Sequence, residues 1–256
     1  MWVSLYLLRF NTPPTTISPA KRGSMMFAPS LYFDLTGYPH AALFDEAESV
    51  WTALNRLAAY LDEANLGVIR GHVSSQAYLV HPELISIGEG SVVEPGAYIA
   101  GPCIIGKGCV VRHGAYVRGQ VVTGDQCVIG HTTEMKGAIL LNHAHAAHFA
   151  YVGDTILGNH VNLGAGAKCA NLRLDNQEIT ILYQGEKVAT GRRKFGAVIG
   201  DQAQLGCNSV TNPGTLVGRG AAVCPGVNVG GIIPARHYVK MKGRIAIIPT
   251  EAVAVG

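Results

Sequence analysis

Histidines are concentrated in one short stretch, His143-Ala144-His145-Ala146-Ala147-His148. A neutral imidazole can accept a proton from a reacting amine or bind a metal ion. The H-x-H-x-x-H spacing has no accompanying carboxylate, and alternate residues of an extended chain point in different directions, which argues against a metal site. A solvent-facing structural role is preferred for His143 and His145. For His148 we prefer a general base, although spacing alone leaves a structural role open.

A period of six residues begins at Ile87 and predicts the fold that positions these side chains. Large residues recur at this spacing, and only one of them is polar: Ile87, Val93, Ile99, Ile105, Val111, Val117, Thr123, Ile129 and Met135. Four residues after each comes a mostly small residue: Ser91, Ala97, Cys103, Cys109, Ala115, Val121, Cys127, Thr133 and Ile139. This period fits neither an amphipathic helix nor an alternating strand, and it indicates a stacked solenoid. Three units would close one triangular coil of about 18 residues, and coils would stack about 4.8 Å apart.

The spacing of the repeat changes after Met135, where two of the steps between large residues shorten from six residues to five. The large positions continue at Leu140, Ala146, Val152, Leu157 and Leu163, and a second regular run follows at Ile199, Leu205, Thr211, Val217, Val223 and Val229. Residues 175–196 interrupt the repeat between these two runs. Within them, ITILYQGEKVAT predicts a β-hairpin with a Gln184-Gly185 turn that projects from one corner.

The segment before the repeat predicts a short helical cap. Asp45-Glu46-Ala47-Glu48 resembles a capping box, and apolar residues then follow at helical spacing, at Val50, Leu54, Leu57 and Leu61. We expect a helix up to about Asn65 that packs on the first coils. The predicted organisation is a disordered extension at 1–24, the cap at 25–66, the β-helix at 67–235 with its insertion at 175–196, and a terminal segment at 236–256.

Composition excludes several classes of protein. A formal charge of +3 with only 14% charged residues argues against a nucleic-acid binder, which needs a dense basic surface. The apolar opening MWVSLYLLRF is too short for a membrane span. The six cysteines form no CxxC pair and are interpreted as small thiols in a reducing cytoplasm.

Counting coil faces from Ile87 places Arg112 and His148 on the same face, two coils and about 10 Å apart along the stack. Lys136 would begin the next face, and Tyr151 would end the face that carries His148. All four side chains are therefore expected near one vertical edge. A histidine with two cations nearby suits an anionic substrate that has a proton to lose.

Several blocks, taken in order, resemble one known family. These blocks are Arg112-His113-Gly114-Ala115, Glu134-Met135-Lys136, the run from His148 to Asp154, Val161 to Gly166, and Ile199-Gly200-Asp201. They are similar to the acetyltransferase half of the bifunctional N-acetylglucosamine-1-phosphate uridyltransferase/glucosamine-1-phosphate acetyltransferase. The similarity covers roughly residues 87–230. It implies an all-β, left-handed parallel β-helix of hexapeptide repeats.

The resemblance also implies a reaction. His148 would be the base that takes a proton from the amine of glucosamine 1-phosphate as this amine attacks the thioester of acetyl-CoA, for UDP-N-acetylglucosamine and cell-envelope precursor synthesis. The residues implied to hold the acceptor are Arg112, Lys136, Tyr151, Asn162, Asn171 and Lys194. Those implied to line the acetyl-CoA site, between subunits of a homotrimer, are Leu172, Cys207 and Pro225. Backbone N–H groups near Leu172 would bind the oxyanion.

Departures from the family leave alternatives open. The glycine-rich nucleotide signature is absent, so uridyl transfer by this chain is not expected. Leu172 replaces the family's tyrosine, and Cys207 replaces its serine. The insertion ends with Arg192-Arg193-Lys194, which is either a solvated loop or a clamp for a phosphate. The alternative function is a non-catalytic β-helix subunit that binds sugar phosphates and partners a separate sugar nucleotidyltransferase.

Overall fold

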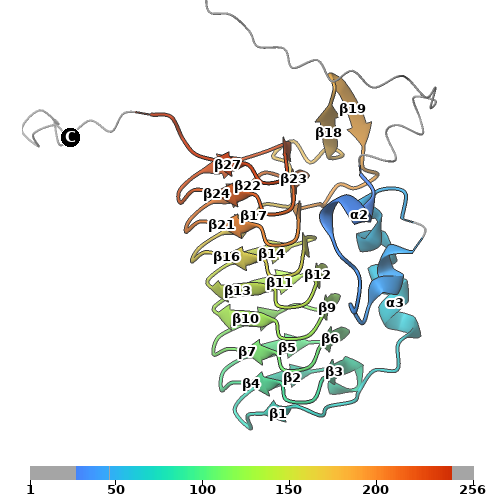
Figure 1. Cartoon of the computed structure of the whole chain (residues 1–256). Helices are drawn as coiled ribbons and strands as arrows, with labels where there is room; N and C mark the ends of the chain where they lie inside the picture. Colours follow the sequence, from blue (N-terminus) through green and yellow to red (C-terminus); the bar gives the residue numbers. More distant parts are fainter. Residues whose placement is uncertain (1–26, 46, 244–256) are drawn as a thin grey trace, which may run out of the picture.

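The computed structural model describes residues 27–45 and 47–243, which form a solenoid of three parallel sheets with an N-terminal segment along one side (Figure 1). The first face contains β1 (His72–Val73), β4 (Val92–Val93), β7 (Val110–Val111), β10 (Val128–His131), β13 (His145–His148), β16 (Asn162–Leu163), β21 (Gln204–Leu205), β24 (Ala222–Val223) and β27 (Tyr238–Val239). The second face contains β2 (Tyr78–Val80), β5 (Tyr98–Ala100), β8 (Tyr116–Val117), β11 (Glu134–Lys136), β14 (Tyr151–Gly153), β17 (Lys168–Cys169), β22 (Val210–Thr211) and β25 (Asn228–Val229). The third face contains β3 (Ile85–Ile87), β6 (Cys103–Ile105), β9 (Val121–Thr123), β12 (Ala138–Leu140), β15 (Ile156–Leu157), β20 (Ala197–Ile199), β23 (Thr215–Val217) and β26 (Ile232–Ile233).

The interior of the coil is filled by the large residues of the repeat. Ile87, Ile105 and Met135 are each at most 1% exposed, and they share one continuous cluster with the small residues that follow them. The predicted all-β, left-handed parallel β-helix is confirmed. The coil is stable because each short strand pairs with the corresponding strand of the next coil through parallel hydrogen bonds, which satisfy its backbone polar groups.

One position of the predicted repeat is wrong. Ile139 does not point into the coil, because the five-residue step after Met135 shifts the phase by one residue and gives the small inward slot to Ala138. Ile139 instead faces outward from β12 and is fully buried beneath the N-terminal segment. The coils shorten accordingly: Val128 pairs with Val110 below it and with His145 above it.

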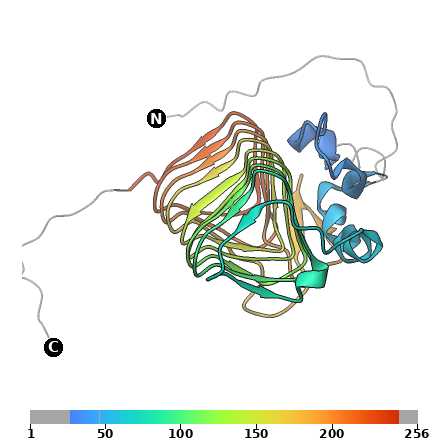
Figure 2. The ribbon, with the colours of Figure 1, turned by 90° about the horizontal axis from the view of Figure 1, so that it is seen from below.

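The N-terminal segment lies along the outer side of the third face. It contains α2 (Pro29–Tyr32), two short 3₁₀ turns at Ala41–Phe44 and Val50–Thr52, and α3 (Ala53–Glu63); a further 3₁₀ turn, Pro82–Leu84, precedes β3. Its aromatic and aliphatic side chains form a second core with outward-facing residues of the third face: Val122, Ile139, Leu141, Ile156, Val198 and Leu216. The segment that contains the predicted helix is not confined to the first coils, because its core is packed against residues from Ile104 of β6 to Ile232 of β26 along the flank (Figures 1 and 2).

The predicted capping box is also wrong. Asp45 ends the preceding 3₁₀ turn, and its backbone N–H donates to the Ala42 carbonyl. The helix begins only after Ser49, and neither Ser49 nor Thr52 caps it with a side-chain hydrogen bond. The amphipathic character that predicted this helix is nevertheless real, since Leu54, Leu57 and Leu61 are buried.

The insertion forms the predicted hairpin. β18 (Thr180–Tyr183) pairs antiparallel with β19 (Glu186–Ala189), and Gln184 and Gly185 make the turn with positive φ. The hairpin leaves the coil between β17 and β20, and Ile181 joins the second core. The ring of Tyr183 lies 5.5 Å from that of Phe27.

The predicted extension at 1–24 lies outside the described residues, as does most of the terminal segment. The boundaries at 25–66, 67–235 and 236–256 stay predictions. In the described part of the chain, no helix is both long and apolar enough to cross a bilayer.

Burial of His40 predicts that acid destabilises the fold. Burial lowers the pKa of His40, against the opposing effects of a backbone hydrogen bond at Thr123 and the charge of Asp125. As pH falls below the unfolded pKa of about 6.5, the unfolded chain takes up a proton that the folded chain does not yet accept, so unfolding becomes more favourable. We expect urea denaturation to show a larger loss of stability between pH 7.5 and pH 5.5 for the native protein than for His40→Gln. Equal losses would contradict this assignment.

Candidate active site

The corner between the first and second faces stacks a column of side chains from successive coils. We define this corner column as His113, His131, His148, Ala165, Cys207 and Pro225. Backbone N–H groups of the residues that follow donate to the carbonyls one coil below, as from Phe149 to His131 and from Gly166 to His148. His148, Cys207 and Pro225 therefore share one corner. Two coil steps separate His148 from Cys207, which corresponds to about 10 Å between their backbones.

His148 projects into solvent from the end of β13. Phe149 takes a φ of +36° and turns the chain at the corner, which leaves both side chains exposed. Within residues 27–45 and 47–243, the imidazole of His148 makes no hydrogen bond. The ring below it differs: the Nδ1 atom of His131 lies 3.0 Å from the carbonyl oxygen of His113, and these two rings stack at 5.6 Å. Of these three corner histidines, all exposed, His148 is thus the one whose two ring nitrogens both lack a hydrogen bond among the described residues.

Arg112 lies on the first face, one position before the corner column and directly after β7. It shares this face with His148, which lies two coils above it, and with Asn162, which pairs in register with His145. Burial lowers the pKa of His145, and the positive charge of Arg112 lowers it further. The charge of the Arg112 guanidinium is therefore felt at the His145 ring on the first face.

Lys136 and Tyr151 lie on the second face, and their predicted positions are corrected. Glu134 begins β11 and pairs with Tyr151, which begins β14, whereas Lys136 is the last residue of β11. The error arises because the corner turn occupies residues 132–133 and 149–150, with positive φ at Thr132 and Phe149. Lys136 thus stands at the far end of its strand from His148, and Tyr151 stands beside the corner. The prediction that all four side chains gather at one edge is wrong for Lys136.

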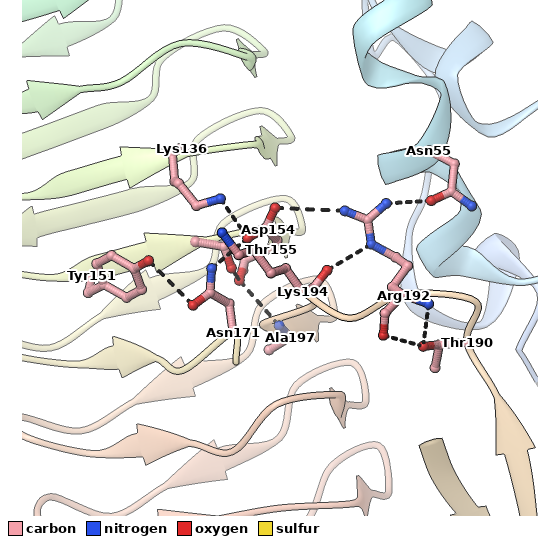
Figure 3. Close-up of polar contacts among 11 residues, drawn as sticks. Asn55, Lys136, Tyr151, Asp154, Thr155, Asn171, Thr190, Arg192, Lys194 and Ala197 are labelled. Carbon is pink, nitrogen blue, oxygen red and sulfur yellow. Dashed lines mark hydrogen bonds and ion pairs between the residues drawn. The ribbon is translucent and has the colours of Figure 1, made fainter. Parts of the chain in front are cut away.

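Asp154 is the centre of a polar cluster at the far end of the second face (Figure 3). Its Oδ2 atom lies 2.9 Å from the Nζ atom of Lys136 and accepts a hydrogen bond of 2.5 Å from Asn171. The Oδ1 atom lies 3.7 Å from Nη2 of Arg192. Tyr151 crosses the face toward this cluster, because its hydroxyl donates to Asn171 over 3.4 Å. We call Lys136, Asp154, Asn171 and Arg192 the Asp154 cluster.

The Asp154 cluster has an excess of positive charge. Two cations surround one carboxylate, which leaves one formal positive charge. The three charged side chains are 20% exposed or less, so solvent screens them weakly. Burial lowers the pKa of Arg192 while the carboxylate opposes this effect, and a guanidinium stays protonated at neutral pH. Such a cluster favours an anionic ligand.

Leu172 and Lys194 lie where the insertion leaves and rejoins the coil, since their backbones form an antiparallel bridge. Both side chains are exposed. Leu172 is therefore beside the Asp154 cluster and away from Cys207 and Pro225, on the other side of the second face. Sequence reasoning missed Asp154 and Arg192 as partners. Asp154 could have been noticed as the acidic residue that ends the block from His148 to Asp154. Its partner Arg192 comes from the insertion, and nothing in the spacing pointed to that contact.

Comparisons with known proteins agree on the solenoid region. A family model described as the GMPPB C-terminal domain matches residues 99–193. The bifunctional sugar-1-phosphate nucleotidylyltransferase/acetyltransferase of Sulfurisphaera tokodaii is 37% identical over 92 residues, which are 36% of this chain and 23% of that protein. The bifunctional protein GlmU of Methanococcus vannielii is 34% identical over 110 residues, 43% of this chain and 26% of that protein. This solenoid is a relative of these bifunctional proteins.

The relationship confirms the resemblance found in the sequence. The matches span only about a quarter of these two relatives, so it does not carry over the activity of either whole protein. A solved UDP-N-acetylglucosamine acyltransferase of Francisella novicida is 16% identical, with a TM-score of 0.45 over 66% of this chain and 64% of that chain. At that score the likeness carries no weight for function. No group of His, Cys, Asp and Glu side chains suited to a metal ion occurs in the described part of the chain.

Proposed function

We propose that this protein is an N-acyltransferase that moves the acetyl group of acetyl-CoA to the amine of an amino-sugar phosphate, with glucosamine 1-phosphate as the first candidate. The observation that carries the proposal is the corner column, where an exposed imidazole shares one corner of the coil with Cys207 and Pro225. The kinship with bifunctional proteins named as acetyltransferases supports the reaction class. The end product would serve UDP-N-acetylglucosamine and cell-envelope precursor synthesis.

In the proposed reaction, His148 removes a proton from the acceptor's ammonium group. The freed amine forms the C–N bond at the thioester carbonyl, and the C–S bond then breaks. As the C–S bond breaks, the nitrogen's second proton passes through solvent to the CoA thiolate, and His148 returns the first proton to solvent, so the products are the amide, the CoA thiol and one released proton. A neutral imidazole suits this role because its usual pKa lies close to neutral pH. The solvent-facing position of His148 leaves both ring nitrogens open to substrate.

The acceptor would lie across the second face. Its amine would approach His148 at the corner, and its phosphate would approach Lys136 and the net positive charge of the Asp154 cluster. Tyr151 lies between these two ends and contacts Asn171 of the cluster, so the two side chains would offer hydroxyl and amide groups to the sugar. Arg112, Asn162 and Lys194 stay proposed contacts from the flanking faces. In this arrangement the cations bind the phosphate at one end of the acceptor, so they do not have to lie next to His148, which acts on the amine at the other end.

Acetyl-CoA would run along the corner column past Cys207 and Pro225. The groove would be closed by a neighbouring copy of the chain, so the proposed form is a homotrimer with each site shared between subunits. Leu172 lies on the far side of the second face, so it would line the acetyl-CoA site that is shared with a neighbouring copy. Backbone N–H groups near Leu172 would bind the oxyanion there. Cytoplasmic location stays part of the proposal.

A substrate panel tests this function. We expect release of CoA thiol from acetyl-CoA with glucosamine 1-phosphate, and slower release with glucosamine or with UDP-linked amino sugars. The purified protein, its oligomeric state checked by light scattering, is assayed with each acceptor. Absence of thiol release with every acceptor would reject the proposal.

Cys207 gives an independent readout of the acetyl-CoA groove. Among the described cysteines it is the exposed one, while Cys224 is half-buried and the other four are buried. We expect maleimide to modify Cys207 fastest, and saturating CoA to slow this modification at least fivefold. Peptide mapping by mass spectrometry identifies the site, with Cys224 as the internal reference. Unchanged labelling of Cys207 at saturating CoA would place the cosubstrate elsewhere.

A second candidate is the non-catalytic subunit that binds sugar phosphates and partners a separate sugar nucleotidyltransferase. It is favoured by the lack of any orienting hydrogen bond on His148 within the described chain, since a general base is usually held by a partner group. Binding of glucosamine 1-phosphate without turnover, together with co-purification of a nucleotidyltransferase, would support it.

A further inference from the structure

Arg192 joins three parts of the molecule at the edge of the candidate site. Its Nη2 atom faces Asp154 of the coil at 3.7 Å, and its Nη1 atom donates to the Oδ1 atom of Asn55 in α3. Its Nε atom donates over 3.0 Å to the carbonyl of Lys194, and Thr190 fixes its backbone N–H. Figure 3 shows the guanidinium between the helix and the carboxylate. The insertion therefore presents this side chain in a fixed position and not as a free loop cation.

The charge balance at Asp154 depends on this guanidinium. Without Arg192, Lys136 and Asp154 would form a neutral pair, and the carboxylate would hold the ammonium in place. A phosphate could then recruit Lys136 only by leaving a carboxylate that is 10% exposed without a charged partner, which is costly. With Arg192 present, Asp154 keeps a cation when Lys136 turns to a ligand.

We infer that Arg192 is a positioning residue for the acceptor phosphate: it holds Asp154 so that Lys136 can bind the phosphate. The inference rests on the proposed function and names a specificity device within it. The insertion and the N-terminal segment thereby act together, since Asn55 supports Arg192 from α3. The expected consequence is discrimination between phosphorylated and unphosphorylated amino sugars.

The test compares KM and kcat for glucosamine 1-phosphate and for glucosamine. Arg192→Ala should raise KM for the phosphorylated acceptor about tenfold, as expected for the loss of one weakly screened charge, and leave kcat and the KM for glucosamine nearly unchanged. Arg192→Lys should recover part of the affinity, because it restores the charge. Lys187→Ala removes an exposed cation from the hairpin of the same insertion and serves as the matched control, with no change expected.

Asn55→Ala distinguishes the effect of the charge of Arg192 from the effect of its structural support by α3. It removes the support from α3 but keeps both cations, so we expect less than a threefold change in KM. If Asn55→Ala and Arg192→Ala have equal effects, or if Arg192→Ala weakens both acceptors alike, Arg192 is only a structural tie and the inference is wrong.

The failure of the proposed function is recognised separately. If the native protein transfers no acyl group to any acceptor, calorimetric titration with glucosamine 1-phosphate and with glucosamine replaces the kinetic readout. A selective loss of phosphate-dependent binding in Arg192→Ala would then still support the inference, whereas equal binding of both ligands by the native protein would overturn it.

Discussion

Replacement of His148 by alanine is expected to lower kcat for acyl transfer by a factor of about 10² to 10⁴, the usual contribution of a positioned general base. The side chain is exposed and makes no hydrogen bond within residues 27–45 and 47–243, so its loss should leave the fold intact. KM for both substrates should change little, because the imidazole acts on the proton and not on the phosphate. Steady-state kinetics with acetyl-CoA and glucosamine 1-phosphate measures the effect.

His131 provides the matched control for this experiment. It occupies the same corner column one coil below, and its ring packs against His113 and Phe149. His131→Ala should reduce kcat by less than about fivefold. Equal losses in the two variants would show that the corner needs bulk and not a base, and an active His148→Ala would remove His148 from the mechanism.

Replacement of Trp51 by alanine is expected to cost about 3–5 kcal/mol of unfolding free energy, the usual range for a buried aromatic residue. Trp51 is 2% exposed, and its ring lies 5.0 Å from that of Phe27 and 6.1 Å from that of Phe195. It therefore links the N-terminal segment to the end of the insertion. Urea denaturation followed by circular dichroism gives the change.

Two controls define what the Trp51 result means. Leu174→Ala removes a fully exposed apolar side chain and should change stability by less than about 0.5 kcal/mol. Limited proteolysis shows whether the N-terminal segment detaches by itself in Trp51→Ala. A cost below 1 kcal/mol with no increase in proteolysis would mean that the segment is not part of the cooperative fold.

The six-residue ladder made the coil predictable because an inward position in a narrow triangular interior accepts only apolar or small side chains. Ile87, Ile105 and Met135 met this condition without ambiguity. The faces were harder to assign. Turn residues at the corners are not marked by size, so Lys136 was placed at the wrong end of its strand. The phase was lost separately at the five-residue step after Met135, which turned Ile139 outward.

The packing of the N-terminal segment on the third face could have been predicted from the outward-facing positions of the repeat, which the six-residue pattern of inward residues does not include. The outward positions there are apolar in successive coils, as at Val122, Ile156, Val198 and Leu216, and such a column needs a partner. The Asp154 cluster had no comparable signal. Its members meet only because the insertion brings Arg192 back beside β14, and sequence spacing does not encode a contact made through a long excursion of the chain.

The most direct measurement follows the acetyl group itself. Acetyl-CoA labelled with ¹³C in the acetyl carbonyl is incubated with glucosamine 1-phosphate and the native protein, and the acceptor is analysed by NMR spectroscopy. Acyl transfer at the corner column predicts an amide carbonyl on the sugar nitrogen, formed only when protein and both substrates are present. An unlabelled acceptor after prolonged incubation with folded protein, or label on a hydroxyl oxygen, would contradict this account.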